Sequence, residues 1–151
     1  MKVSIIIPVI RTEKAKRCIN AINQNAGIPR DDYEVIFRED IKRIGCPKMV
    51  KQLVTQTKYD LVCFLGDDTI PQPDFLKNAL RAMAAIPDGW GMVSFNDNPT
   101  ITRSGTHWIC HKKLLPLLGG EFFHTGYKHC FCDDELMVRC QLMNRYIYAY
   151  D

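Results

Sequence analysis

The chain has 151 residues, of which 46% are hydrophobic and 25% charged, so we expect one globular domain with one core. Its formal net charge of +3 is too small to indicate a protein that binds nucleic acid, for which a basic stripe is typical. The longest apolar run, residues 3–10, is too short to span a bilayer and lacks the cleavage site of a signal peptide, which argues against a transmembrane segment.

The seven cysteines are an odd number, and no two of them form a CxxC pair. In a chain with no export signal, this usage indicates free thiols in a reducing compartment. We therefore expect a cytoplasmic protein.

The first 95 residues alternate short apolar runs with segments of helical periodicity. The runs at 3–9, 33–37, 61–65 and 92–95 predict four strands. Three helices are predicted between them, the first after Thr12, the second near Pro47 and the third at Pro73-Asp74. The apolar residues at helical spacing are Ala15, Cys18, Ile19 and Ile22, then Met49, Val50, Leu53 and Val54, then Leu76, Ala79, Leu80 and Met83.

Strands that alternate with helices predict an α/β fold with a mostly parallel central sheet and helices on both faces. Continuous apolar runs are typical of strands that are covered on both faces. In such sheets, ligands bind beyond the carboxyl ends of the strands. We therefore expect the residues after the first three strands to line one crevice, namely Arg11-Thr12, Arg38-Glu39-Asp40 and Asp67-Asp68.

The pattern changes in the last third of the chain. Residues 96–105 are polar and predict a loop that crosses the top of the sheet, and residues 121–132 predict an aromatic, His-rich loop over the crevice. A short strand at 106–110, a short helix at 112–118, a helix that begins at Asp133-Asp134-Glu135 and a last strand at 146–150 complete the expected elements.

Asp67-Asp68 is the sharpest local feature. Two adjacent carboxylates directly after a buried strand repel each other unless a cation or hydrogen-bond donors compensate. A Mg²⁺ or Mn²⁺ ion could do so while it binds a substrate diphosphate, since hard cations take carboxylate and phosphate oxygens. The alternative is an ordinary turn, because Asp is a common turn residue.

Several segments, taken in order, resemble the inverting family 2 of glycosyltransferases. The opening strand Val3-Ser4-Ile5-Ile6-Ile7-Pro8 is similar to that family's "vSiiiP", and Gly66-Asp67-Asp68-Thr69 before Pro73-Asp74-Phe75-Leu76 is similar to its variant DxD motif and the helix that follows. The segment Cys132-Asp133-Asp134-Glu135-Leu136-Met137-Val138-Arg139 resembles the "EDvDLclR" segment that supplies the base. These matches cover nearly the whole chain.

The resemblance implies a single GT-A domain, residues 1–151, in which residues 1–95 bind the nucleotide-sugar and residues 96–151 form the acceptor side. It implies transfer of a hexose-type sugar from a nucleotide-sugar, with UDP-sugars favoured, to a carbohydrate or other hydroxyl acceptor. Mn²⁺ or Mg²⁺ is the implied cofactor. No nucleic acid is an implied partner.

The resemblance also assigns roles to single residues. Asp68 matches the metal-binding carboxylate, Asp67 its neighbour at the ribose or metal, and Asp133 or Asp134 the catalytic base. The nucleotide-facing positions are Pro8, Val9 and Arg11 after the first strand and Glu39 and Asp40 after the second. An alternative interpretation of Asp133-Asp134-Glu135 is an acidic first helical turn, which the helix dipole favours.

Two departures from the family pattern stand out. The second strand ends in Arg38-Glu39-Asp40-Ile41 where the family has "DDGS", which puts uracil recognition in doubt. The helix at Pro47-Lys48-Met49 replaces the family's "aRN.g" helix.

Histidine and cysteine residues crowd the segment between 107 and 132. This composition is compatible with a zinc site, but the spacing fits no known finger or ribbon. A second hypothesis is that His124 or His129 completes the shell of the catalytic metal. Free buried cysteines and loop histidines are the third interpretation.

Two other functions remain open from the sequence. A non-catalytic GT-A-like nucleotide-binding module would keep the fold without turnover. A sugar-phosphate nucleotidylyltransferase would need a glycine-rich loop after the first strand, and Pro8-Val9-Ile10-Arg11-Thr12 contains no glycine.

Overall fold

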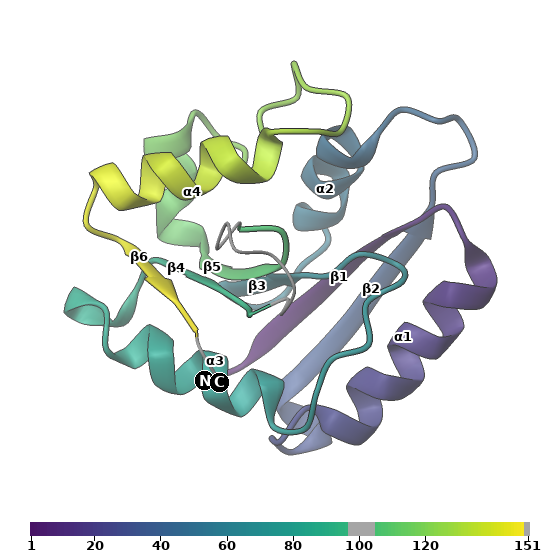
Figure 1. The fold of residues 1–151 in the computed structure, drawn as a ribbon, viewed down its shortest axis with the longest axis horizontal. Coiled ribbons are helices and arrows are strands. Elements are labelled where there is room, and N and C mark those ends of the chain that lie inside the picture. Colours follow the sequence, from purple (N-terminus) through teal and green to yellow (C-terminus); the bar gives the residue numbers. More distant parts are fainter. Residues whose placement is uncertain (97–104, 150–151) are drawn as a thin grey trace.

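A six-stranded sheet forms the centre of the computed structural model, which describes residues 1–96 and 105–149 (Figure 1). The strands lie in the order β2-β1-β3-β5-β4-β6. Their bounds are β1 Val3–Val9, β2 Tyr33–Glu39, β3 Leu61–Phe64, β4 Met92–Ser94, β5 Trp108–His111 and β6 Tyr146–Tyr148.

Strand direction is parallel over most of the sheet. β1 pairs in parallel with β2 and β3, and β4 pairs in parallel with β6. β5 is antiparallel to both of its neighbours, β3 and β4. The mostly parallel α/β sheet expected from the sequence is therefore confirmed.

Helices cover both faces of the sheet (Figure 1). One face carries α1 (Thr12–Asn25) and α3 (Phe75–Ala84), and the other carries α2 (Cys46–Val54), α4 (Cys132–Leu142) and the 3₁₀ helix η3 (Lys112–Leu118). Short 3₁₀ turns, η1 (Arg30–Asp32) and η2 (Pro87–Gly89), complete the elements of the described ranges.

This two-sided covering explains why β1 is apolar without alternation. Ile5 and Ile7 pack into the cluster on the α1 and α3 face, while Ile6 packs into the cluster on the α2 and α4 face. All three side chains are fully buried. Side chains alternate between the faces of a strand, so a strand with a core on each side needs apolar residues at every position.

Most predicted elements agree with the structure to within two residues. The strand predicted at 106–110 is β5, two residues shorter at its start, and the helix predicted at 112–118 is the 3₁₀ helix η3. Of the loop predicted at 96–105 and the strand predicted at 146–150, residues 97–104 and 150 lie outside the described residues. No helix in the described ranges is long and apolar enough to cross a membrane.

Candidate functional site

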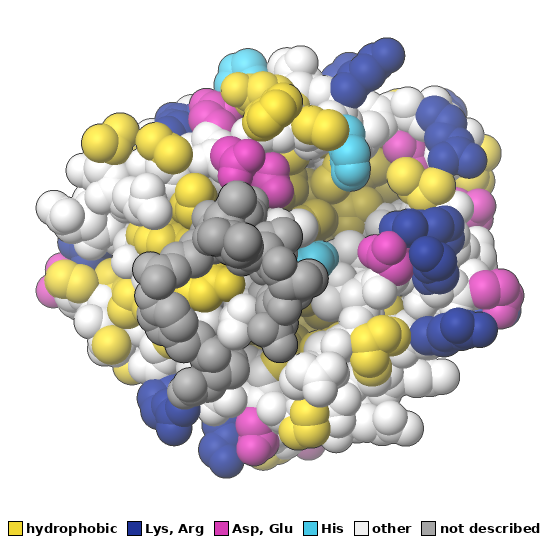
Figure 2. Space-filling model, viewed as in Figure 1, with side chains coloured by type: hydrophobic (Ala, Val, Ile, Leu, Met, Phe, Trp, Pro, Cys, Tyr) yellow, Lys and Arg dark blue, Asp and Glu magenta, His cyan; other side chains and the backbone are white. Residues whose placement is uncertain are grey.

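A cavity of about 690 Å³ lies where β1 and β3 end. Figure 2 shows it as a hollow with hydrophobic side chains on its floor and charged side chains and histidines beside it. Four parts of the chain line it: Pro8, Ile10 and Arg11; Asp40, Cys46 and Met49; Phe64, Gly66, Asp67 and Asp68; and Thr106, His107, Phe123 and residues 129–134. Of the residues predicted to line one crevice, Arg11, Asp40, Asp67 and Asp68 line this cavity, and Thr12, Arg38 and Glu39 do not.

Hydrogen bonds to Asp67 link the end of β3 to the end of β1. Its Oδ2 accepts the backbone N–H groups of Ile10 at 2.8 Å and Arg11 at 2.7 Å. Its Oδ1 accepts two guanidinium N–H groups of Arg11, one of them from Nε at 3.0 Å. The side chain of Asp67 is only 3% exposed.

These donors set the charge of Asp67. Burial disfavours the charged form, but the hydrogen bonds from Arg11 and from the backbone amides of Ile10 and Arg11 outweigh it, so the pKa of Asp67 lies below its ordinary value. The same contact with Asp67 raises the pKa of Arg11. The pair is therefore an ion pair at neutral pH.

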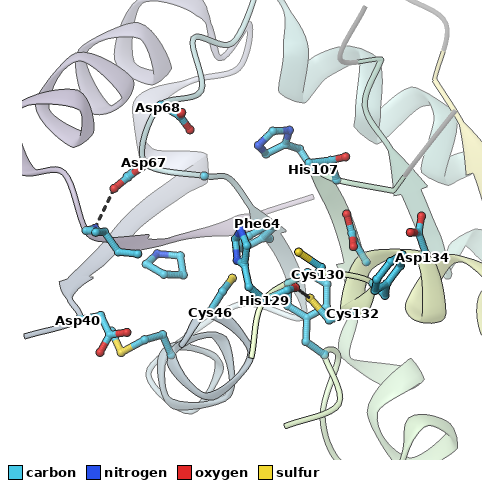
Figure 3. A pocket seen from close by; sticks show the side chains of 18 of the residues that line it. Asp40, Cys46, Phe64, Asp67, Asp68, His107, His129, Cys130, Cys132 and Asp134 are labelled. Carbon is cyan, nitrogen blue, oxygen red and sulfur yellow. Dashed lines mark hydrogen bonds between the residues drawn. The ribbon is translucent and has the colours of Figure 1, made fainter. Parts of the chain in front are cut away.

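Asp68 has a more open position. Its side chain is 45% exposed, and its Oδ2 lies 2.9 Å from a terminal guanidinium nitrogen of Arg11 and 3.8 Å from Lys14 Nζ. Arg11 thus bridges both carboxylates of the Asp67-Asp68 pair. Figure 3 shows the two aspartates on one side of the cavity.

His107 lies next to these carboxylates, although the sequence did not single it out as a site residue. It directly precedes β5, and its Nε2 is 2.8 Å from Thr69 Oγ1. A Cβ placed on Gly66 would lie 3.2 Å from His107 Nε2 and 3.4 Å from Asp68 Oδ1, so these two polar atoms converge on one glycine. The absence of a side chain at residue 66 leaves room for both.

Asp133 and Asp134 line the cavity from the first turn of α4. Both are half-buried. Figure 3 shows Asp134 across the cavity from the Asp67-Asp68 pair. The loop that precedes them contributes Phe123, His129 and Cys130 to the cavity wall, as expected for a segment that covers the crevice.

The other predicted nucleotide-binding residues differ in whether they reach the cavity. Pro8, Arg11 and Asp40 line the cavity, whereas Val9 is buried and Glu39 is exposed and is not among the lining residues. Asp40 is itself buried, and its carboxylate accepts the backbone N–H groups of Ile44 and Gly45, each at 2.9 Å. Asp40 therefore orders the loop before α2.

His124, predicted as a metal ligand, does not reach the cavity. It is exposed, is not among the lining residues, and accepts the backbone N–H of Gly126 at its Nδ1. His129 does line the cavity. Within residues 1–96 and 105–149, no three His, Cys, Asp or Glu side chains are grouped so that they could hold a metal ion, and all seven cysteines are free thiols.

The donor set at the Asp67-Asp68 pair does not fit the divalent cation that the resemblance implies. A carboxylate has about four lone-pair sites, and four N–H groups already occupy those of Asp67. Asp68 Oδ1 forms no ion pair with the described residues, and Asp68 Oδ2 already faces two cations. No step of the chemistry below is therefore assigned to a metal.

Comparison with known proteins supports the fold. No protein-family model matches the chain, and no curated protein matches its sequence. TarS of S. aureus, residues 1–349 in complex with UDP, matches with a TM-score of 0.76 at 16% identity, over 100% of this chain and 59% of that one. The mannosyltransferase PcManGT of Pyrobaculum calidifontis, in complex with GDP-Man and Mn²⁺, matches with a TM-score of 0.79 at 19% identity, over 97% of this chain and 54% of that one.

A more distant match is Rv0371C of Mycobacterium tuberculosis in complex with manganese, with a TM-score of 0.53 at 10% identity over 98% of this chain and 88% of that one. The chain spans less than two thirds of the length of the TarS and mannosyltransferase structures. These matches establish that the chain has a GT-A fold, as the sequence predicts.

Proposed function

We propose that this chain is a glycosyltransferase domain that transfers a sugar from a nucleotide-diphosphate sugar to a hydroxyl acceptor, with inversion at the anomeric carbon, as in glycosyltransferase family 2. One observation carries the proposal: the strand-end residues Arg11, Asp67 and Asp68 and the first-turn carboxylates Asp133 and Asp134 line the same cavity. The GT-A fold supports it, and so do fold neighbours solved with UDP, UDP-GlcNAc and GDP-Man.

The proposed reaction is one displacement. The acceptor oxygen forms a bond to the anomeric carbon while the bond from that carbon to the diphosphate oxygen breaks, and the nucleoside diphosphate leaves with the electron pair. Asp133 or Asp134 takes the acceptor proton, a role that requires a carboxylate on the acceptor side of the cavity. Residues 1–95 bind the donor and residues 96–151 the acceptor.

On the donor side, Pro8 and Arg11 are proposed to contact the nucleotide, which is a UDP-sugar by preference. Val9 and Glu39 do not line the cavity, and the carboxylate of Asp40 already accepts two backbone N–H groups, so the geometry supports Pro8 and Arg11 as nucleotide contacts better than these three residues. The resemblance also gives Asp68 the role of a Mn²⁺ or Mg²⁺ ligand. The ion pairs of Asp68 with Arg11 and Lys14 do not support that role.

The proposal is tested by calorimetric titration with UDP and GDP, followed by assays of sugar transfer and donor hydrolysis. We expect Asp133→Asn or Asp134→Asn to lower kcat by about 10²–10⁴-fold, the usual contribution of a general base, with nucleotide affinity unchanged. Glu135→Gln is the matched control, because Glu135 lies in the same helical turn but pairs with Arg139 at 3.7 Å.

Two results would change the assignment. Nucleotide binding with neither transfer nor donor hydrolysis identifies a non-catalytic binding module. No binding of either nucleotide, with or without Mn²⁺, contradicts the proposed function.

A further inference from the structure

The start of α1 and the end of β3 together form a charged cluster at the cavity rim. Arg11 and Lys14 are half-exposed, with side-chain exposures of 48% and 52%, and both lie within 4 Å of Asp68 Oδ2. The 14-residue helix α1 begins between them at Thr12, and the side chain of its N-cap residue, Arg11, makes no capping hydrogen bond. Two cations and the N-terminus of α1 thus lie beside Asp68, and of the two cations only Arg11 is among the residues that line the cavity.

The negative charge of Asp67 is already satisfied inside the protein. Its four N–H donors come from one guanidinium group and two backbone amides, and the carboxylate is buried. To bind a metal ion, Asp67 would have to release one of these donors into a site with little water. Asp67 is therefore a structural carboxylate that holds Arg11 in place.

The charge of Asp68 is balanced in a different way. Arg11 and Lys14 face its Oδ2, so a divalent cation at Asp68 would have two positive charges as immediate neighbours. Like charges this close repel each other, which disfavours the metal. An anion at the same place is instead attracted by both side chains and by the N-terminus of α1.

We propose that Arg11 and Lys14 hold the diphosphate of the nucleotide-sugar in place of a divalent metal ion, so that nucleotide binding by this chain is metal-independent. The inference rests on the proposed function. The guanidinium of Arg11 is fixed by Asp67 through Nε and one terminal nitrogen, and its other terminal nitrogen and the Lys14 ammonium pass from Asp68 to the phosphate oxygens. A planar guanidinium and a mobile ammonium both bind phosphate well.

This arrangement assigns Asp68 a role opposite to that of a metal ligand. As a competitor for the two cations, it keeps them at the mouth of the cavity until the diphosphate displaces its carboxylate. The two roles of Asp68 therefore predict opposite effects of one substitution on nucleotide affinity. Asp68→Asn weakens nucleotide binding if Asp68 holds a metal, and strengthens it if Asp68 competes with the diphosphate.

The test is calorimetric titration of the whole chain with UDP and GDP, in EDTA and then in Mn²⁺. We expect dissociation constants within about threefold of each other in the two buffers, and affinity in EDTA about three- to tenfold higher for Asp68→Asn. Lys14→Ala lowers affinity in EDTA by about tenfold. Lys16→Ala is its control, because Lys16 lies on the same helix but pairs with Glu13 at 2.7 Å, whereas Lys14 pairs with Asp68.

Arg11 is kept intact in these experiments, because its replacement would remove donors from the buried Asp67. Binding that requires Mn²⁺ and is weakened by Asp68→Asn overturns the inference but leaves the proposed function standing. An absence of binding in both buffers overturns both.

Discussion

Asp67 and Asp68 are adjacent and carry the same side chain, yet their environments differ. The side chain of Asp67 is 3% exposed and accepts four N–H groups, whereas that of Asp68 is 45% exposed and shares one oxygen between Arg11 and Lys14. Asp67 therefore acts on the fold by joining β3 to β1. Asp68 remains available to a ligand in the cavity.

Asp67→Asn is expected to lower the free energy of unfolding by about 1–3 kcal/mol at pH 7, because the new amide group faces N–H donors that lose an acceptor. The effect depends on pH. Since the pKa of Asp67 in the folded protein is below its ordinary value, its ionised form stabilises the fold above the unfolded pKa of about 3.9, and this contribution is lost as the pH falls through the folded pKa.

Urea unfolding at pH 7, 5 and 3 measures this difference. The difference between wild type and Asp67→Asn should be full at pH 7 and 5 and smaller at pH 3, because its loss begins below the unfolded pKa and is complete only below the lowered folded pKa. Asp88→Asn is the control, since Asp88 is 76% exposed and its substitution should change stability by less than about 0.5 kcal/mol. A difference for Asp67→Asn that is the same at all three pH values would contradict the role of its charge.

The sequence predicted the carboxylate pair but not its partner. Asp67-Asp68 follows an apolar run, which local pattern reveals, whereas the contact with Arg11 joins residues 56 positions apart and depends on how β1 and β3 align. The histidines predicted as candidates for the metal shell were His124 and His129, and of these only His129 lines the cavity. His107, which was not predicted as a site residue, lies beside Asp68, whereas His124 is exposed and is not among the lining residues.

At the scale of elements, the direction of β5 decides which residues reach the site. Trp108 at the start of β5 pairs with Phe64 at the end of β3, so the antiparallel direction brings His107 and Thr106 to the cavity. A parallel strand would have brought its other end there. Apolar periodicity predicts burial but not direction, which is why the strand was predicted and His107 was not.

The loop before α2 contacts the loop that covers the cavity at Gly45. Its φ of 95° favours glycine, and a Cβ at this position would lie 2.7 Å from the backbone oxygen of Lys128. Gly45→Ala is therefore expected to lower the free energy of unfolding by about 2–4 kcal/mol and to weaken nucleotide binding, because both the strain and the clash act on the cavity wall.

Gly119→Ala separates strain from clash. Gly119 has a similar positive φ of 81°, but a Cβ there would meet no atom within 4 Å. Gly119→Ala should therefore lower the free energy of unfolding only by the backbone strain, about 1–2 kcal/mol, and leave nucleotide binding unchanged. Thermal unfolding and UDP titration of both variants measure the difference, and equal effects on both would show that the contact between Gly45 and Lys128 is unimportant.

At the scale of the whole molecule, the burial of the cysteines shows how completely the helices cover the sheet. Cys18 and Cys63 lie in the core cluster under α1 and α3, and Cys110, Cys132 and Cys140 lie in the cluster under α2 and α4. Burial raises the pKa of the Cys63 and Cys110 thiols well above the ordinary value. It raises the pKa of the other buried or half-buried thiols, Cys18, Cys46, Cys132 and Cys140, to about 12.

Cys130 is the exposed cysteine, and it lines the cavity. Since the thiolate is the reactive form, N-ethylmaleimide at pH 7.5 should modify Cys130 first and the other six thiols only when the chain unfolds. Mass spectrometry should therefore find one adduct in the native protein, seven in urea and none in native Cys130→Ser. UDP should slow the modification of Cys130, because a nucleotide in the cavity restricts access to its wall.

These outcomes test the fold and the site separately. Rapid modification of Cys63 or Cys110 without urea would mean that the central strands are not covered on both faces. Modification of Cys130 at the same rate with and without saturating UDP would place the nucleotide away from the loop that carries it. Protection by UDP that is equally strong in EDTA and in Mn²⁺ would instead locate the nucleotide in this cavity and show that no divalent cation is needed to hold it there, as expected if Arg11 and Lys14 bind the diphosphate.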